Sequence, residues 1–203
     1  LGFNKSLLIN EGVRVARAPW VLFHDADIAV PRDYLAGVLA RAQQGWEAVR
    51  PIRFLFYLDE GTSAGFISSH ALHGTPERVT QNFPGGSTAV NKDVYWELGG
   101  HDEAFVGWGG EDTEFLDRLK TRKLFPGSFA PAAHLWHPAA PKKTTGDRNQ
   151  SLLDARLSVP AQERIRCLQA MRASAGISTD SDQAPPVAAQ IGAGQRLADW
   201  HHP

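Results

Sequence analysis

The sequence predicts an α/β fold. Segments whose apolar residues recur at helical spacing alternate with short apolar runs typical of buried strands, and no internal repeat interrupts this order. A length of 203 residues suits one domain with a sizeable core, whereas two domains of half that size would each bury little surface. We therefore expect one α/β domain followed by a tail.

The first two predicted elements are a helix and a strand. Apolar residues recur at helical spacing over 4–17, with Asn4 or Ser6 as the N-cap and Pro19 after the end. The continuous apolar run 20–23 is typical of a buried strand. We expect the polar end of this strand at the carboxyl edge of the sheet, where α/β folds bind ligands.

The next predicted elements are a helix, a β segment and a long loop. Pro31 favours the start of a helix over 31–44, and the composition of 48–57 favours β structure. Residues 59–78 are rich in Gly, Ser and His, which indicates a loop. A loop of this length in a compact domain is usually functional or mobile.

Short elements are predicted in the second half of the domain. A strand is expected over 86–91 and a short helix over 92–98, which two glycines close. A longer helix is expected over 111–123, and β-like runs surround 125–129 and 132–136. The order of helices and strands remains that of an α/β domain.

The C-terminal part separates into a helix and a tail. A helix is predicted from 149 to about 173, and the Ala, Pro, Gln and Gly content beyond it is typical of disorder. We therefore divide the chain into a core at 1–148, a C-terminal helix at 149–175 and a low-complexity tail at 176–203.

Charge and cysteine content narrow the function. The net charge of -1 and the pI near 6.8 provide no broad basic field for nucleic acid, and no segment is apolar for long enough to cross a bilayer. Cys167 is the only cysteine, so no disulfide can form within the chain, and a cytoplasmic location is expected. The chain begins at Leu1 without a signal pattern, so we expect a cut or processed beginning.

The first candidate site is Asp25-Ala26-Asp27, directly after the strand 20–23. In an extended segment, residues two apart face the same way, so both carboxylates can address one hard cation or a metal-bound diphosphate. The alternative interpretation is a solvated acidic turn.

The second candidate site is Gly107-Trp108-Gly109-Gly110-Glu111-Asp112. Acidic residues in the first turn of a helix oppose the helix dipole, so Asp112 has the alternative role of a cap. That role leaves an aromatic residue among three glycines unexplained, because glycine-rich backbone is costly to order. A mobile lid whose Trp108 stacks on a sugar ring accounts for both features.

The third candidate site is His134-Leu135-Trp136-His137. Residues three apart on a straight strand point to opposite faces, so the two histidines can share a metal only if the chain turns between them. Two imidazoles and the carboxylate of Asp27 would suit a borderline divalent ion such as Mn²⁺. Either histidine alone is more often a core or surface residue.

Four motifs, taken in order, resemble those of animal β-1,4-galactosyltransferases and their bacterial relatives. Phe3-Asn4-Lys5-Ser6 resembles their Phe-Asn-Arg-Ala, and His24-Asp25-Ala26-Asp27 resembles their Asp-Val-Asp. Pro84-Gly85-Gly86-Ser87 resembles their Gly-Gly-Val-Ser, and Gly107-Trp108-Gly109-Gly110-Glu111-Asp112 is the strongest match. Polypeptide N-acetylgalactosaminyltransferases and bacterial chondroitin-type polymerases share parts of this pattern, which covers residues 3–137.

The resemblance implies a fold and a reaction. The fold would be GT-A-like, with a mixed sheet flanked by helices, and N-terminally truncated, because the family's nucleotide-binding strand precedes the first motif. The reaction would move a hexose or N-acetylhexosamine from a UDP-sugar to a carbohydrate acceptor with inversion, as in bacterial polysaccharide synthesis. The cofactor would be Mn²⁺ or another divalent cation, and an upstream segment or a partner would supply the missing nucleotide-binding part.

The resemblance also implies a role for each matching residue. Asp112 would be the general base, and the acceptor would be bound by Trp108, Glu111 and Asp112. The donor would be bound by Phe3, Lys5, Asp25, Asp27, Gly85 and Gly86. The metal would be bound by Asp27, His134 and His137. Lys5 stands where the family has arginine, so the positive charge is kept and the bidentate fork is lost.

Two other functions stay open at this point. A catalytically incomplete carbohydrate-binding or scaffold remnant of the same fold would explain the short beginning. A metal-dependent hydrolase would use Asp25, Asp27, His134 and His137, but it leaves the glycine-rich acidic motif unexplained.

Overall fold

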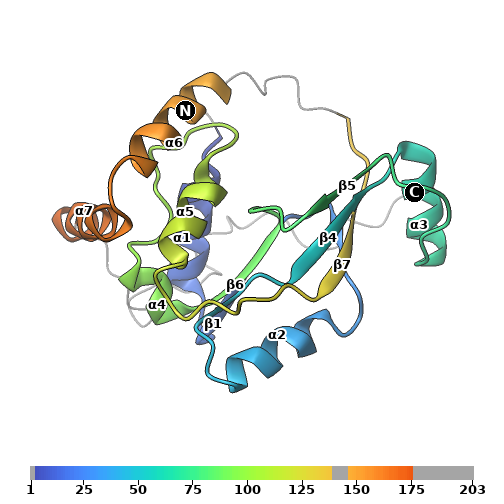
Figure 1. The fold of residues 1–203 in the computed structure, drawn as a ribbon, viewed down its shortest axis with the longest axis horizontal. Helices are drawn as coiled ribbons and strands as arrows, with labels where there is room; N and C mark the ends of the chain where they lie inside the picture. Colours follow the sequence, from blue (N-terminus) through green and yellow to red (C-terminus); the bar gives the residue numbers. More distant parts are fainter. Residues whose placement is uncertain (1–2, 139–145, 176–203) are drawn as a thin grey trace, which may run out of the picture.

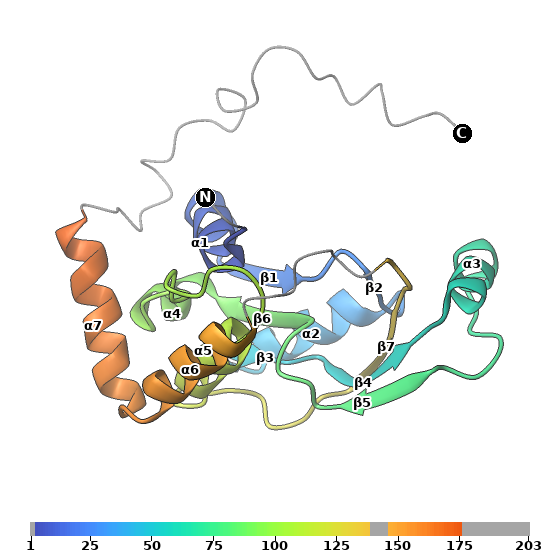
Figure 2. The ribbon, with the colours of Figure 1, turned by 90° about the horizontal axis from the view of Figure 1, so that it is seen from above.

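The computed structural model describes residues 3–138 and 146–175. Two small sheets lie in the middle of the molecule, α7 lies at one end, and α3 lies at the other (Figures 1 and 2). The helices are α1 (Lys5–Val15), α2 (Tyr34–Gln43), α3 (Glu60–Ser69), α4 (Lys92–Glu97), α5 (Glu111–Leu119), α6 (Gly146–Leu157) and α7 (Ala161–Ser174).

The first sheet has three antiparallel strands in the order β1 (Trp20–His24), β6 (Ser87–Asn91) and β3 (Ala48–Val49). The second sheet has four strands in the order β2 (Ile28–Ala29), β7 (Ala130–His134), β4 (Ile52–Tyr57) and β5 (Arg78–Gln81). β4 runs parallel to β7 and antiparallel to β5, so the second sheet is mixed. The predicted α/β class with a mixed sheet and flanking helices is therefore confirmed.

The hydrophobic core has two clusters, one on each face of the first sheet. Ala89 and Val90 are neighbours on β6, and they belong to different clusters because successive side chains of a strand point to opposite faces. The Val90 cluster joins α1, α4, α5 and α7 through residues such as Val13, Tyr95 and Phe115. The Ala89 cluster joins both sheets to α2.

A buried ion-pair network fixes α5, the helix that opens with the acidic motif. Glu114 and Arg118 lie one turn apart on α5, both at most 1% exposed, and the Arg118 Nη2 donates to the Glu114 carboxylate at 2.5 Å. Arg164 of α7 donates to the same carboxylate at 2.6 Å. Because each charge is paired, α7 anchors the helix that presents Asp112.

Several predicted elements are confirmed with small shifts of their ends. α1 begins after Asn4, whose side-chain oxygen accepts a hydrogen bond from the Leu7 N–H at 2.9 Å, as an N-cap does. The predicted β segment 48–57 is two strands in different sheets, and Pro51 lies at the break between them. Pro51 lacks an N–H group, which excludes it from a central ladder.

Several secondary-structure predictions were wrong. Residues 59–78 are not one loop: they contain α3, and the Asp59 carboxylate caps this helix by accepting from the Thr62 N–H at 2.6 Å. The helix that begins with the acidic motif, α5, ends at Leu119 rather than at 123. Residues 125–129 do not form a strand. β2 and β5 were not predicted, because strands of two and four residues carry almost no periodic signal.

The C-terminal helix predicted at 149–175 is two helices, α6 and α7. The break falls at Ser158–Pro160, where proline cannot continue a helix and instead stands before the first turn of α7. The predicted tail at 176–203 lies outside the described residues.

Candidate functional site

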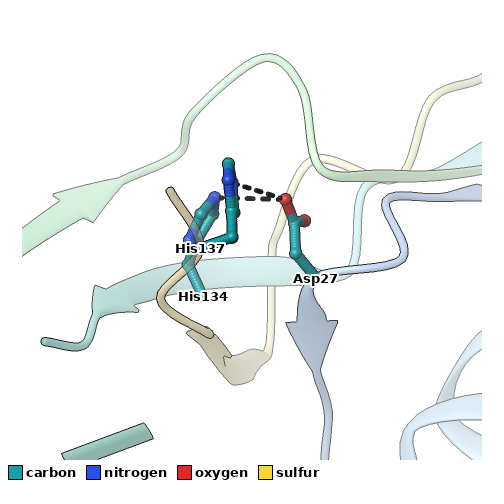
Figure 3. Close-up of side chains that lie close together, drawn as sticks. All are labelled: Asp27, His134 and His137. Carbon is teal, nitrogen blue, oxygen red and sulfur yellow. Dashed lines mark ion pairs between the residues drawn. The ribbon is translucent and has the colours of Figure 1, made fainter. Parts of the chain in front are cut away.

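Asp27, His134 and His137 form a cluster that can hold a metal ion. One ligand atom from each residue lies within 4.8 Å of the others. The Oδ2 atom of Asp27 is 3.6 Å from the Nε2 atom of His134 and 3.2 Å from that of His137, and all three side chains converge (Figure 3). The structure thus brings together the three residues predicted as metal ligands.

The backbone brings these residues together. β2 pairs with β7. In this pairing Ile28, which directly follows Asp27 in the sequence, lies opposite His134. The Leu135 N–H then donates to the Asp27 carbonyl at 2.8 Å, at the point where the chain leaves β7. The chain changes direction between the two histidines, which is the condition for both imidazoles to face one point.

Two further side chains support the histidines. The ring of Tyr57 on β4 stacks on the His134 ring, with centroids 4.7 Å apart. The hydroxyl of Ser63 on α3 accepts a hydrogen bond from the Trp136 N–H at 2.7 Å, and Ser63 is buried. α3 therefore helps to fix the segment that carries His137.

The donor set fits a borderline divalent cation. Two imidazole nitrogens and a carboxylate oxygen are ligands that Mn²⁺ and its neighbours accept. The side chains of His137 and Asp27 are 43% and 36% exposed, so the cluster opens to solvent on one side. A cation held there would keep open positions for a ligand such as a diphosphate.

Asp25 does not join this cluster, so of the two arrangements expected for Asp25-Ala26-Asp27, the one in which both carboxylates face a single cation is not present. Residues 25–27 are not extended, because the Ile28 N–H donates to the Asp25 carbonyl at 3.2 Å across a turn. The turn sends the Asp25 side chain toward Lys5, with the Asp25 Oδ1 and Lys5 Nζ atoms 3.2 Å apart.

Lys5 is the centre of a second cluster, which is made of carboxylates. Its Nζ atom lies 3.1 Å from Asp112, 3.2 Å from Asp25 and 3.7 Å from Glu111. Burial disfavours the charge of Lys5, but the carboxylates of Asp112, Asp25 and Glu111 outweigh burial and raise its pKa. Lys5 is therefore protonated at neutral pH. It contacts both Asp25, which is predicted to bind the donor, and Asp112, which is predicted to bind the acceptor.

Asp112 and Glu111 both have raised pKa values. Burial raises the pKa of Asp112, and the charge of Lys5 opposes this rise. Burial also raises the pKa of Glu111, and the neighbouring charge of Asp112 adds to the rise. A raised pKa brings the titration of both carboxyl groups closer to neutral pH.

The glycines of Pro84-Gly85-Gly86-Ser87 let the chain pass close to Asp112. A β-carbon on Gly85 would lie 2.5 Å from the Asp112 Oδ2 atom. Gly86 has a φ of +86°, and its carbonyl accepts from the Asp25 N–H at 3.0 Å. The cleft that Lys5, Asp25, Gly85 and Asp112 line has a free volume of about 20 Å³, which is room for about one water.

Phe3 and the loop that carries Trp108 are joined by a backbone hydrogen bond. The Gly107 N–H donates to the Phe3 carbonyl at 2.7 Å, which links the first and last predicted motifs. Gly107, Gly109 and Gly110 all have positive φ, and Trp108 between them is 57% exposed. Glycine adopts this backbone conformation without the cost that other residues would meet, and the loop leaves the Trp108 ring largely exposed just before the acidic residues in the sequence.

The sequence did not point to Ser63, Tyr57 or Arg50 as parts of the site. The capping pattern of Asp59 and Thr62 could have revealed α3 and therefore the position of Ser63. Tyr57 and Arg50 acquire their positions from strand pairing and from the break at Pro51, which no local pattern encodes.

Comparisons with known proteins agree with the predicted resemblance. A family model described as the N-terminal domain of galactosyltransferase matches residues 70–131. Human chondroitin sulfate N-acetylgalactosaminyltransferase 2 is 27% identical over 148 residues, which cover 66% of this chain and 27% of that protein. Validoxylamine A glucosyltransferase of Streptomyces hygroscopicus subsp. jinggangensis is 24% identical over 184 residues, which cover 75% of this chain and 43% of that protein.

Two solved glycosyltransferase structures are among those similar to this chain, each with a TM-score below 0.5. The catalytic domain of Drosophila β1,4-galactosyltransferase 7 in complex with xylobiose has a TM-score of 0.43 and 18% identity, over 73% of this chain and 60% of that one. GalNAc-T7 with UDP, GalNAc and Mn²⁺ has a TM-score of 0.47 and 14% identity, over 85% of this chain and 41% of that one.

The resemblance to galactosyl- and N-acetylgalactosaminyltransferases is thus confirmed, and the similar curated proteins are glycosyltransferases. The chain spans about a quarter of the human protein and under half of the bacterial one. Within the described ranges, no helix is both long and apolar enough to cross a membrane.

Proposed function

We propose that this chain is the metal- and acceptor-binding part of an inverting glycosyltransferase that uses a UDP-sugar. The observation that carries the proposal is the turn at residues 25–27, which joins the two clusters. Asp25 belongs to the carboxylates around Lys5, and Asp27 belongs to the histidine cluster. A site that splits a sugar diphosphate and activates an acceptor hydroxyl needs these two kinds of group next to each other.

The donor would lie between the two clusters. Asp27, His134 and His137 would hold Mn²⁺, which when bound would stabilise the charge that grows on the diphosphate leaving group. Phe3, Gly85 and Gly86 would contact the nucleotide side of the donor. The transferred sugar would be a hexose or an N-acetylhexosamine.

Asp112 would act on the acceptor as the general base. It would take the proton of the acceptor hydroxyl while that oxygen forms its bond to the anomeric carbon of the donor. The bond from the same carbon to the diphosphate oxygen would break on the opposite side, so UDP would leave and the configuration would invert. A base of this kind typically contributes about 10²- to 10⁴-fold, and a raised pKa makes the carboxylate a stronger one.

Glu111 and Trp108 would position the acceptor. Glu111 lies next to Asp112, has a raised pKa and leaves its Oε2 atom buried without a hydrogen-bond partner among the described residues. A buried oxygen of this kind is costly unless a ligand satisfies it, and a sugar hydroxyl would do so. Trp108 offers an aromatic face for the apolar side of the sugar ring.

Calorimetric titration with UDP, with and without Mn²⁺, tests the metal site. We expect Mn²⁺-dependent binding in the unmodified chain and its loss in Asp27→Ala and His137→Ala. His73→Ala removes an exposed histidine outside the cluster and should bind as the unmodified chain does. Equal UDP binding by all four proteins would refute the assignment of the ligands.

Transfer assays test the base. Asp112→Asn should keep Mn²⁺-dependent UDP binding and lose about 10²- to 10⁴-fold in transfer rate. Full transfer by this variant would exclude Asp112 as the base. Release of free sugar with every acceptor offered would instead favour a hydrolase.

A further inference from the structure

A second pocket is lined by Arg50 and by residues that follow α5. Its volume is about 400 Å³, and its lining includes Arg50, Lys120, Arg122 and Phe125. These residues come from the β3–β4 break and from the segment that follows α5. The pocket is therefore large enough for a sugar-sized group, and three of its lining residues are cationic.

Two of the three cations lack a carboxylate partner among the described residues. Arg122 pairs with Glu47 at 3.0 Å and with Glu97 at 2.6 Å, so its charge is compensated. Lys120 is exposed just after the end of α5 and makes no ion pair within the described ranges. The pocket thus retains a positive charge.

Arg50 differs from Lys120 because part of its guanidinium group is buried. Its Nη2 atom donates to the backbone carbonyls of Asn82 and Phe83, and its Nε–H group is buried without a partner among the described residues. Burial lowers the pKa of Arg50, because an unpaired charge is costly away from water. An anionic ligand would offset both costs.

The pocket continues the proposed acceptor cleft. α5 carries Asp112 on its first turn, and Lys120 follows its last residue, so these two residues are about 12 Å apart along the helix at 1.5 Å per residue. The Phe83 carbonyl accepts from Arg50, while the Phe83 ring lies 3.0 Å from the place where a β-carbon on Gly85 would stand. Asn82 lines this pocket, and Pro84 and Gly85 line the Asp112 cleft, so residues 82–85 place the two sites next to each other.

We propose that this pocket binds an anionic group on the acceptor saccharide, one or more sugar units away from the reacting hydroxyl. The group would be a carboxylate, a sulfate or a phosphate ester, because a guanidinium binds such oxygens with paired hydrogen bonds. Phe125 supplies an apolar surface beside the cations, which suits the carbon face of a sugar ring. This inference rests on the proposed glycosyltransferase function.

The test is titration of the full chain with two hexasaccharides that differ in charge. Hyaluronan hexasaccharide carries a carboxylate on alternate sugars, and chitohexaose carries none. We expect tighter binding of the hyaluronan fragment, with a preference that falls as salt rises. Equal affinities for the two hexasaccharides would overturn the proposal.

Two variants and one matched control test which cationic side chains bind the anionic group. Lys120→Gln should weaken binding of the hyaluronan fragment about two- to fivefold, as expected for an exposed pair. Arg50→Gln should weaken it about tenfold or more. Lys123→Gln removes the same charge from a side chain that packs against Trp46 outside the pocket, so its binding should not change. An equal loss with Lys123→Gln would overturn the proposal.

The remaining controls separate this inference from the proposed function. Lys120 is exposed, so its replacement should leave the fold intact even if Arg50→Gln fails to fold. In the unmodified chain, binding of the hyaluronan fragment without transfer to any acceptor would contradict the proposed function and support the pocket. A loss of UDP affinity in Lys120→Gln would assign the pocket to the donor and overturn our inference.

Discussion

Replacement of Lys5 by methionine should shift the pH dependence of transfer. The Lys5 ammonium lies 3.1 Å from the Asp112 carboxylate and opposes the rise in pKa that burial causes there. Without this cation, burial and the repulsion from Asp25 and Glu111 would still raise the pKa of Asp112. Only the more distant charge of Arg50 would still lower it. The pKa of Asp112 should therefore rise further.

The size of the shift follows from the contact. An opposite charge at this distance typically lowers a carboxylate pKa by about 1–3 units, so its removal should raise the pKa by a similar amount. A general base must be deprotonated, and the acid limb of kcat/KM should move to higher pH by about 1–3 units. Each unit corresponds to about 1.4 kcal/mol between the two protonation states.

The assay is the pH profile of kcat/KM for Lys5→Met, Lys5→Arg and the unmodified chain. Lys5→Arg keeps the charge and should keep the acid limb near its original position, even if the rate itself changes. A purely structural role for Lys5 would lower the rate at every pH without moving the limb. An unmoved limb in Lys5→Met would refute the reasoning.

Two further predictions concern stability and geometry. Glu114→Gln should lower the free energy of unfolding by about 3–5 kcal/mol in a denaturant titration, because it leaves Arg118 buried without its charged partner. Glu11→Gln, in an exposed pair, should cost at most about 1 kcal/mol, and similar losses would contradict the role of burial. Gly85→Ala should cut the transfer rate about 10²-fold, because its β-carbon would lie 2.5 Å from the Asp112 Oδ2 atom and displace that carboxylate. Gly65→Ala, in a helix with open space around it, should leave transfer unchanged, and an equal loss in both variants would refute the steric explanation.

Much of the candidate site could be predicted from the sequence because its motifs are local. A polar end after an apolar strand, and acidic residues at a helix start, indicate their own structural context. The grouping of Asp27 with His134 and His137 was predicted on chemical grounds, and the structure brings the three together. Their roles in catalysis remain predictions.

The rest depends on contacts between distant segments. The separation of Asp25 from Asp27 results from a turn, whereas an extended chain would have placed both carboxylates together. The contact between Lys5 and Asp112 spans 107 positions, and no local pattern reports it. α3 was not predicted because its glycines and serines have low helix propensity. The capping hydrogen bond of Asp59 helps to stabilise the helix despite this composition.

The histidine cluster is held by its backbone more than by its side chains. The pairing of Ile28 with His134 and the hydrogen bond from the Leu135 N–H to the Asp27 carbonyl do not involve any metal-binding atom. The frame should therefore persist when a donor side chain is exchanged. The metal preference of the proposed site would consequently change by single substitutions while the architecture stays constant, which would make the site a starting point for engineering a different cation requirement.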